Sequence, residues 1–195
     1  MTAEVITTRP EIIVLGASAG GLHAIERVLR SLPRGFPVPI VVVQHRSKES
    51  SDAYTDVVGK SSLLPVREIE DGDALRAPGV YIAPPDYHVL IEPGRTALSI
   101  DDPVSYSRPS IDVLFESAAD TYGARVVAVL LTGANADGAR GLRRVKEAGG
   151  YAIVQNPQTA ESPEMPAAGI AMAPVDLVLE LDGIASALVQ RAAIS

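Results

Sequence analysis

Residues 12–33 have the sequence IIVLGASAGGLHAIERVLRSLP, which joins two different hydrophobic patterns. The opening run, from Ile12 to Leu15, is aliphatic throughout and ends at a glycine, which predicts a short strand buried on both faces. After a glycine-rich segment, large apolar residues recur at helical spacing until Pro33 ends the pattern: Leu22, Ile25, Leu29 and Leu32. The stretch therefore predicts a strand, a tight turn and an amphipathic helix.

The same alternation of strand and helix continues along the chain. Short apolar runs predict further strands at residues 39–44, 66–69, 80–83, 126–131 and 152–155. Helical spacing predicts helices near residues 111–122, with Ser110 as N-cap, and 142–149, and a last helix capped by Asp182. Two runs in which apolar and polar residues alternate flank a Pro93-Gly94 turn and predict a β-hairpin. We expect an α/β, doubly wound, mostly parallel sheet with helices on both faces and the antiparallel hairpin inserted.

The composition limits the classes of partner. The chain has 195 residues, of which 47% are hydrophobic, and a formal net charge of −7. This length predicts one domain over residues 1–195, in which residues 1–10 form a flexible N-terminal segment. An acidic chain lacks the positively charged surface that binds nucleic acids and anionic membranes. We therefore expect no nucleic-acid partner.

Missing sequence features bear on chemistry and location. The sequence has no cysteine, which excludes disulfides, thiolate metal sites and cysteine catalysis. The N-terminal residues show no secretory signal pattern, and the longest apolar run, residues 126–131, is far shorter than the ~18 residues of a membrane span. We therefore expect a cytoplasmic protein without membrane insertion, and one that needs neither a metal nor a cofactor.

Three side chains with complementary chemistry follow three of the predicted strands. Ser18 follows the first strand, His45 follows the second, and Asp137 lies in the loop after the most hydrophobic one. Because the carboxyl ends of parallel strands meet at one edge of the sheet, we expect these side chains to lie close together. A serine, a histidine and an aspartate are the components of a serine-hydrolase triad.

The residues around Ser18 fit a strand-to-helix turn that presents a nucleophile. Residues 16–20 match the pattern G-x-S-x-G, in which small neighbours allow a tight path. The helix begins directly afterwards, so the backbone N–H groups of Ala19 and Gly20 are candidates to bind an oxyanion. The order Ser–His–Asp along the chain differs from the order in α/β-hydrolases, which places this turn on another scaffold.

Each candidate also has a simpler interpretation. The glycines around Ser18 can serve helix–sheet packing alone, and His45 alone can be a hydrogen-bonded loop residue. Asp137 precedes a glycine and can be the N-cap of the following helix. Of the other two histidines, we expect His23 on the surface and His88 in a structural role. A nucleotide-binding loop is disfavoured, because no phosphate-binding motif is complete.

Eight segments, in this order, resemble the catalytic domain of the chemotaxis protein-glutamate methylesterases of the CheB type. They are GASAGG (16–21), VVVQH (41–45), EDGDAL (70–75), GVYIAPPDYH (79–88), RPSIDVLFESAA (108–119), VVAVLLTGANADGARGL (126–142), AIVQNP (152–157) and EMPAAGIAM (164–172). The resemblance implies a nucleophile at Ser18, a general base at His45 and a triad carboxylate at Asp137. It further implies that a backbone N–H at Ala134, where the family has methionine, contributes to the oxyanion hole.

The resemblance also implies a substrate class. Members of this family hydrolyse glutamate γ-methyl esters on the cytoplasmic helices of methyl-accepting chemoreceptors and can deamidate receptor glutamines. The segment 46–50 departs from the family, so we expect residues 46–62 to influence receptor docking. Few residues precede the first strand, and we therefore expect no receiver domain in cis. The alternative is a non-catalytic module that binds receptors or signalling proteins on the same fold.

Overall fold

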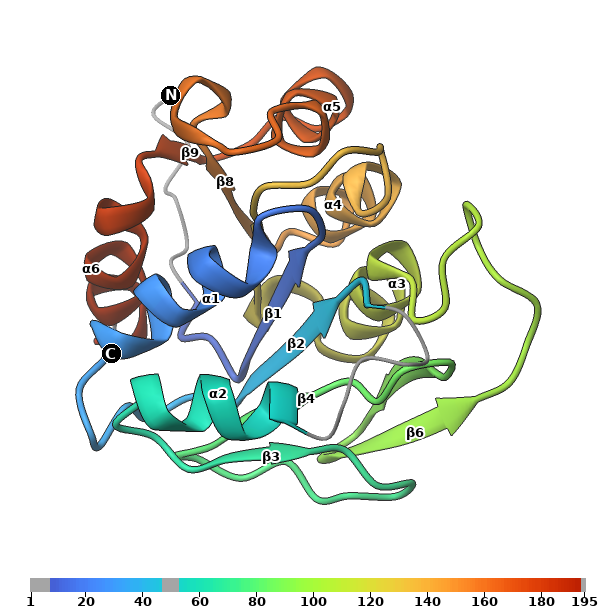
Figure 1. Cartoon of the computed structure of the whole chain (residues 1–195), viewed down its shortest axis with the longest axis vertical. Coiled ribbons are helices and arrows are strands. Elements are labelled where there is room, and N and C mark those ends of the chain that lie inside the picture. Colours follow the sequence, from blue (N-terminus) through green and yellow to red (C-terminus); the bar gives the residue numbers. More distant parts are fainter. Residues whose placement is uncertain (1–7, 47–52, 194–195) are drawn as a thin grey trace.

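The computed structural model of the chain describes residues 8–46 and 53–193. Its centre is a seven-stranded sheet in which every neighbouring pair of strands runs parallel. In spatial order the strands are β3 (Val66–Glu68), β4 (Val80–Ile82), β2 (Ile40–Gln44), β1 (Ile12–Ala17), β7 (Val126–Leu130), β8 (Tyr151–Gln155) and β9 (Leu177–Leu179). The first strand of the chain is therefore central, and later strands extend the sheet in both directions from it (Figure 1).

Helices cover both faces of this sheet. One face packs against α1 (Gly21–Arg30), α2 (Ala53–Ser61) and α6 (Leu181–Ala192). The other face packs against α3 (Ile111–Tyr122), α4 (Ala139–Glu147) and α5 (Glu164–Met172). Two short 3₁₀ turns, at Gly123–Arg125 and Pro157–Thr159, complete the helical elements of the described residues. The doubly wound α/β arrangement confirms the predicted fold class.

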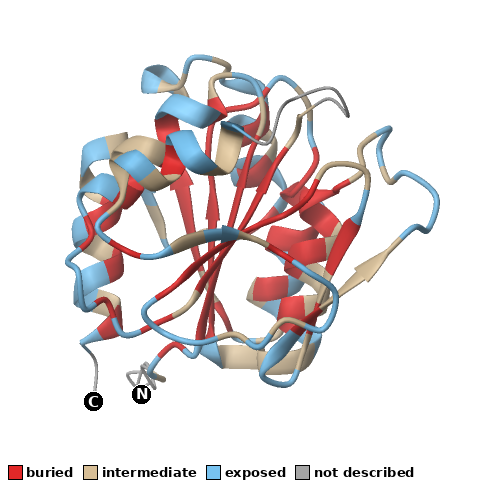
Figure 2. Cartoon of the chain, turned by 60° about the horizontal axis from the view of Figure 1, so that its bottom comes forward, coloured by how far each residue is buried: buried red, intermediate tan, exposed pale blue. Residues whose placement is uncertain are grey.

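Alternate residues of β1 supply the two hydrophobic cores. Ile13, Leu15 and Ala17 face α1 and α6, whereas Ile12 and Val14 face α3 and its neighbours. All of them are fully buried, and the central strands in Figure 2 are red along their length. Strands covered on both faces need apolar residues at every position, which explains the uninterrupted aliphatic run in the sequence.

The predicted hairpin forms a small sheet of its own. Strands β5 (His88–Glu92) and β6 (Arg95–Ser99) pair in antiparallel fashion around the Pro93-Gly94 turn. Val89 and Ile91 of β5 pack into the core on the α3 side. The hairpin therefore fills the long connection from β4 to α3 rather than extending the main sheet.

Several details differ from the sequence-based expectations. Asp182 does not cap the last helix, because it lies inside α6 and pairs with Arg27 of α1; Glu180 occupies the N-cap position. Leu22 is 37% exposed, since it lies in the first turn of α1 and lines an open cleft. Neither α5 nor β9 was expected from the hydrophobic pattern. The predicted N-terminal and docking segments are described only in part, because residues 1–7 and 47–52 lie outside the described ranges.

Gly16 allows β1 and α3 to approach closely, and replacing it tests this packing. A Cβ atom at Gly16 would lie 2.3 Å from Cγ2 of Ile111, whereas one at Gly35 would have no neighbour within 4 Å. We expect Gly16→Ala to lower the free energy of unfolding by about 1–3 kcal/mol through overpacking. Gly35→Ala, the control, should change it by less than about 1 kcal/mol. Urea denaturation measures both, and equal stability of the two variants would contradict this account of the packing.

Candidate active site

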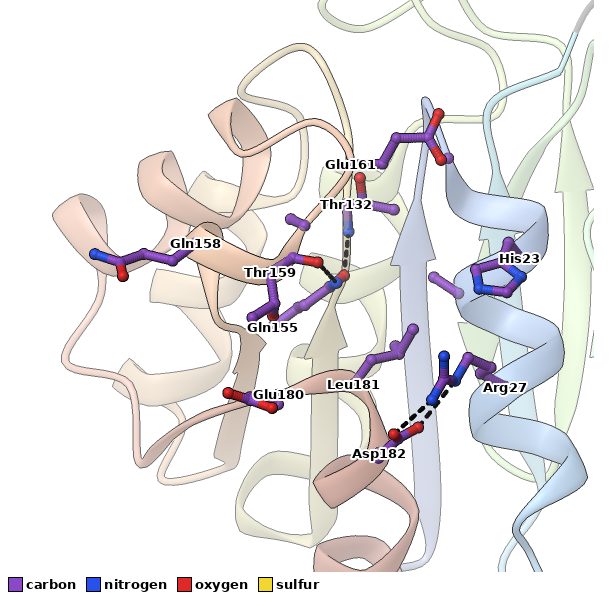
Figure 3. A pocket seen from close by; sticks show the side chains of 13 residues that line it. His23, Arg27, Thr132, Gln155, Gln158, Thr159, Glu161, Glu180, Leu181 and Asp182 are labelled. Atoms are coloured by element: carbon purple, nitrogen blue, oxygen red, sulfur yellow. Dashed lines mark hydrogen bonds and ion pairs between the residues drawn. The ribbon is translucent and has the colours of Figure 1, made fainter.

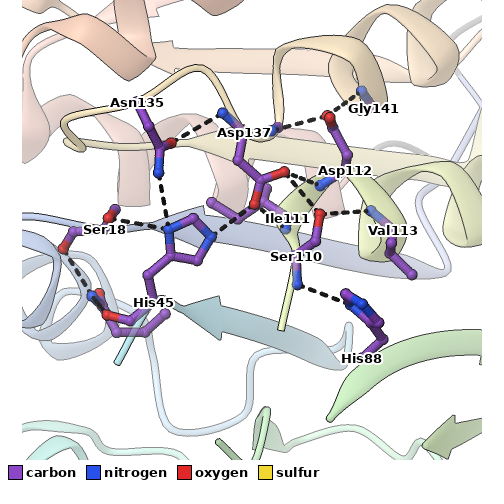
Figure 4. A network of polar contacts seen from close by, with 12 residues as sticks. Ser18, His45, His88, Ser110, Ile111, Asp112, Val113, Asn135, Asp137 and Gly141 are labelled. Carbon is purple, nitrogen blue, oxygen red and sulfur yellow. Dashed lines mark hydrogen bonds and ion pairs between the residues drawn. The ribbon is translucent and has the colours of Figure 1, made fainter. Parts of the chain in front are cut away.

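The structure brings Ser18, His45 and Asp137 into one hydrogen-bonded series at the carboxyl edge of the sheet (Figure 4). His45 Nε2 lies 2.7 Å from Asp137 Oδ2, and His45 Nδ1 lies 3.2 Å from Ser18 Oγ. A carboxylate only accepts hydrogen bonds, so Nε2 carries the proton of the neutral ring and Nδ1 has its lone pair toward the serine. The ring nitrogen that faces the serine is thus Nδ1, the opposite of the arrangement in the chymotrypsin triad.

Adjacent strands position these side chains. Ser18 follows β1, His45 follows β2, and Asp137 follows β7 by a short loop. The backbone ladder continues past the strand ends, because Ser18 N donates to Thr132 O (2.9 Å) and His45 N donates to Ala17 O (3.1 Å). The loops that carry Ser18 and His45 therefore begin with the same spacing as the paired strands before them.

Gln44 joins the serine turn to the histidine. Its side-chain amide donates one hydrogen bond to the carbonyl of Ser18 (2.8 Å) and one to the carbonyl of His45 (2.9 Å).

The backbone of the serine turn is left-handed at Gly20, where φ is 75° and a side chain would also meet Glu161. Ser18 itself has no positive φ, so the turn reaches its tight path through a glycine and not through a strained serine.

Asp137 binds the N-terminus of α3 rather than the helix that follows it. Its buried carboxylate accepts hydrogen bonds from the hydroxyl of Ser110 (2.8 Å) and from the backbone N–H groups of Ile111 (2.7 Å) and Asp112 (3.0 Å). Gly138, not Asp137, is the N-cap of α4. The interpretation of Asp137 as a cap of the following helix is therefore wrong, although the residue does satisfy helix N–H groups elsewhere.

Asp112 makes the reciprocal contact. Its carboxylate accepts from the backbone N–H groups of Gly138 (2.9 Å) and Gly141 (2.7 Å), at the start of α4. The start of α3 thus binds the carboxylate of Asp137, which precedes α4, and the start of α4 binds the carboxylate of Asp112 in α3. This exchange satisfies N–H groups that a helix leaves unpaired in its first turn.

The two carboxylates respond to burial in opposite ways. Burial alone would raise the pKa of Asp137, but hydrogen bonds from His45 and from the N–H groups of Asp112 and Ile111 outweigh it, so the pKa lies below its ordinary value. Burial raises the pKa of Asp112, and the charge of Asp137 adds to that rise while the Gly141 N–H opposes it. The site therefore holds a charged Asp137 against His45.

The remaining histidines lie where the sequence predicted. His23 is exposed on α1. His88 is buried; its Nδ1 accepts from the backbone N–H of Ser110 (3.2 Å), and its Nε2 donates to the carbonyl of Asp102 (3.1 Å). His88 is therefore structural, and it fixes the backbone of the residue whose hydroxyl binds Asp137.

Asn135 is a polar neighbour of the series that the sequence pattern did not single out. Its side-chain oxygen accepts from the backbone N–H of Asp137 (3.0 Å), which orients the amide nitrogen toward His45 Nδ1 (3.3 Å). The Ser18 hydroxyl and the Asn135 amide thus approach the same ring nitrogen. Its place in the strand-end loop beside Asp137 was the available signal, but asparagine is common in loops of every kind because its side chain favours turns.

The backbone groups proposed for an oxyanion have no partner within the described ranges. In residues 8–46 and 53–193, the N–H groups of Ala19, Gly20 and Ala134 donate to no protein acceptor. A cleft of about 410 Å³ opens beside Ser18 and is lined by Gly20, Gly21, Leu22, His23, Glu26 and Gln44. A small acyl group therefore has access to Ser18 from solvent.

A second hollow, of about 390 Å³, lies between α1 and the C-terminal part of the chain (Figure 3). Arg27 and Asp182 pair across its lower rim, and the Gln155 side chain is held by Thr132 N and Thr159 O. None of the three candidate catalytic side chains lines it.

In the described part of the chain, no cluster of three or more His, Asp or Glu side chains is arranged for a metal ion. No helix of the described residues is long and apolar enough to span a membrane.

An acid titration tests the charge state of Asp137. Its lowered pKa means that the ionised carboxylate stabilises the fold at pH values above about 3.8, and that this contribution is lost as pH falls through the folded-state pKa. We expect Asp137→Ala to reduce the free energy of unfolding by about 2–4 kcal/mol at pH 7, because buried donors lose their acceptor. The deficit should shrink between pH 4 and pH 2 in urea titrations of both proteins. A deficit that stays constant over that range would contradict the lowered pKa.

Comparisons with known proteins agree on one family. The family model described as CheB methylesterase matches residues 13–188. A Leptospira interrogans protein is 45% identical over 181 residues, which cover 92% of this chain and 94% of that protein. The protein-glutamate methylesterase/protein-glutamine glutaminase 2 of Anaeromyxobacter dehalogenans is 44% identical over 180 residues; the match covers 92% of this chain and 53% of that protein. The crystal structure of the Thermotoga maritima CheB methylesterase catalytic domain superposes with a TM-score of 0.88 at 33% identity, covering 94% of this chain and 99% of that one.

Proposed function

This chain belongs to the CheB methylesterase family, and from that membership we propose that it removes methyl groups from glutamate γ-methyl esters of methyl-accepting chemoreceptors. The observation that carries the proposal is the hydrogen-bonded series Ser18–His45–Asp137. In it Ser18 is the nucleophile, His45 the general base and Asp137 the carboxylate that orients the ring. In this proposal the catalytic domain acts in the cytoplasm on the helices of the receptor.

Acylation begins with proton transfer to Nδ1 of His45. As Ser18 Oγ attacks the γ-carbonyl carbon of the ester, Nδ1 takes its proton and the ring becomes an imidazolium. Asp137, which accepts from Nε2–H at 2.7 Å, stabilises that positive charge. When the tetrahedral intermediate collapses, Nδ1–H gives its proton to the methoxy oxygen. Methanol leaves, and the glutamyl group remains as an ester on Oγ.

Hydrolysis of the acyl-enzyme uses the same groups in reverse. A water molecule gives a proton to Nδ1 while its oxygen attacks the glutamyl carbonyl, and the proton then returns to Oγ as the carbon–Oγ bond breaks. The free glutamate side chain ionises and leaves. In both stages the carbonyl oxygen becomes negative, and the N–H groups of Ala19, Gly20 and Ala134 are the donors we assign to it.

The same site accommodates glutamine deamidation. A primary amide differs from the methyl ester only in its leaving group, which departs as ammonia after receiving the Nδ1 proton. The Anaeromyxobacter relative is named for both activities. We propose deamidation of receptor glutamines as the second reaction of this chain.

Replacing the nucleophile separates an esterase from a binding module. Ser18→Ala removes one hydroxyl from a half-buried turn residue, so we expect the fold to persist and methanol release from a methylated receptor fragment to fall to the background rate. Gas chromatography of methanol measures the rate, and circular dichroism checks the fold. Release at the wild-type rate would remove Ser18 from the mechanism. No release by the wild-type chain would favour the non-catalytic module.

Replacing the carboxylate tests the orienting role of Asp137. Asp137→Asn keeps the shape of the side chain but favours the wrong ring tautomer of His45, and we expect kcat to fall about 10³–10⁴-fold. Asp182→Asn is the matched control, because that exposed carboxylate pairs with Arg27 away from the site; it should alter kcat by less than about twofold. A fall of less than about threefold for Asp137→Asn would reduce Asp137 to a structural residue.

A further inference from the structure

The segment between β6 and α3 carries the two most exposed large hydrophobic side chains of the described residues. Tyr106 is fully exposed, at 104%, and Ile100 is 74% exposed. In Figures 1 and 2 this segment projects from the body of the molecule. Apolar side chains held in water at the end of a projection are typical of surfaces that bind a partner.

The tip of this segment is a tight turn with an unfavourable backbone. Val104 and Ser107 exchange both backbone hydrogen bonds, with N–O distances of 3.1 and 2.9 Å. The two residues between them, Ser105 and Tyr106, have positive φ angles of 51° and 62°, a combination that normally selects Asn-Gly. A residue with a side chain is strained in this conformation, because its Cβ atom crowds the following carbonyl oxygen. A simple connection would not need a tyrosine here, so the strain points to a function of its ring.

The base of the segment is anchored to the active site. Nη1 of Arg108 donates to the carbonyls of Ile100 (2.9 Å) and Asp101 (3.0 Å), and the same guanidinium binds Asp86. His88 holds the carbonyl of Asp102 and also accepts from the N–H of Ser110, which binds Asp137. Both ends of the segment are therefore tied to residues beside the catalytic series, and a segment held at its base loses less entropy on docking.

A cleft connects this turn to His45. It measures about 310 Å³ and is lined by His45, Arg46, Tyr106, Ser107, Arg108 and Pro109. A glutamyl ester that reaches Ser18 is separated from its own backbone by two methylene groups. The polypeptide that carries the ester must therefore pass close to the entrance of the site. Tyr106 lies at that entrance, in the lining of the cleft that reaches His45.

We propose that Tyr106 is a docking residue that packs against the receptor helix carrying the methylated glutamate; this inference rests on the proposed function. The ring contacts an apolar residue of that helix near the ester-bearing position, because Tyr106 and His45 line the same cleft. The cleft has two arginines and no carboxylate among its lining residues. Because each guanidinium already pairs with a carboxylate of this chain, the docking role rests on the exposed ring of Tyr106 and on the cleft it shares with His45, not on charge.

Three variants test the docking role. Tyr106→Gly removes the ring and suits the positive φ, Tyr106→Phe keeps the ring, and Val178→Ala truncates an exposed apolar side chain (44% exposed) on the edge strand β9. We expect Tyr106→Gly to lower kcat/KM for a methylated receptor fragment about tenfold, mainly through KM. The other two variants should stay within about twofold of wild type. Hydrolysis of p-nitrophenyl acetate should stay within about twofold in all three.

The outcomes are distinct. Wild-type turnover of the receptor fragment by Tyr106→Gly, or an equal loss on both substrates, overturns the docking role. If the wild-type chain releases no methanol, the proposed function fails, and binding of the fragment to Ser18→Ala decides the docking question separately. Tenfold weaker binding by Ser18→Ala/Tyr106→Gly supports the docking role in that case. Equal binding by both proteins, or no binding by either, overturns it.

Discussion

The buried carboxylate of Asp137 is the group on which the arrangement of the site depends. A charge with no exposed surface must be fully hydrogen-bonded, and its partners here are Ser110, the first N–H groups of α3 and His45. Asp112 returns the same contact to α4. Because the start of α3 binds Asp137 and the start of α4 binds Asp112, the two carboxylates tie these helix starts together, and the ring of His45 is hydrogen-bonded at their junction.

Much of the fold and the three candidate residues could be predicted from the sequence, for a physical reason. Strands buried on both faces require uninterrupted apolar runs, and parallel strands direct their loops to one edge, so the sequence pattern alone places Ser18, His45 and Asp137 near one another. The helix α5 could not be predicted, because its sequence EMPAAGIAM shows no separation of polar and apolar faces. The helix that Asp137 binds also could not, since that depends on the packing of α3 beside α4 and not on local spacing.

The supporting residues were hidden for a similar reason. Gln44, Asn135 and Ser110 are ordinary polar residues at the ends of elements, and each gains its role from a contact with a segment distant in sequence. Ser110 was recognised as an N-cap and does accept from Val113 N, but its bond to Asp137 spans 27 positions. The resemblance to a family pointed to Ser18, His45 and Asp137 as candidates without revealing what holds them in place.

Gln44 gives the site a mechanical property. Because one amide group binds the carbonyls of both Ser18 and His45, the same side chain resists displacement of either residue relative to the other. Local fraying at the sheet edge should then displace Ser18 and His45 together. On heating, activity should consequently disappear together with the central strands β1 and β2, and not at a lower temperature through loosening of the site alone.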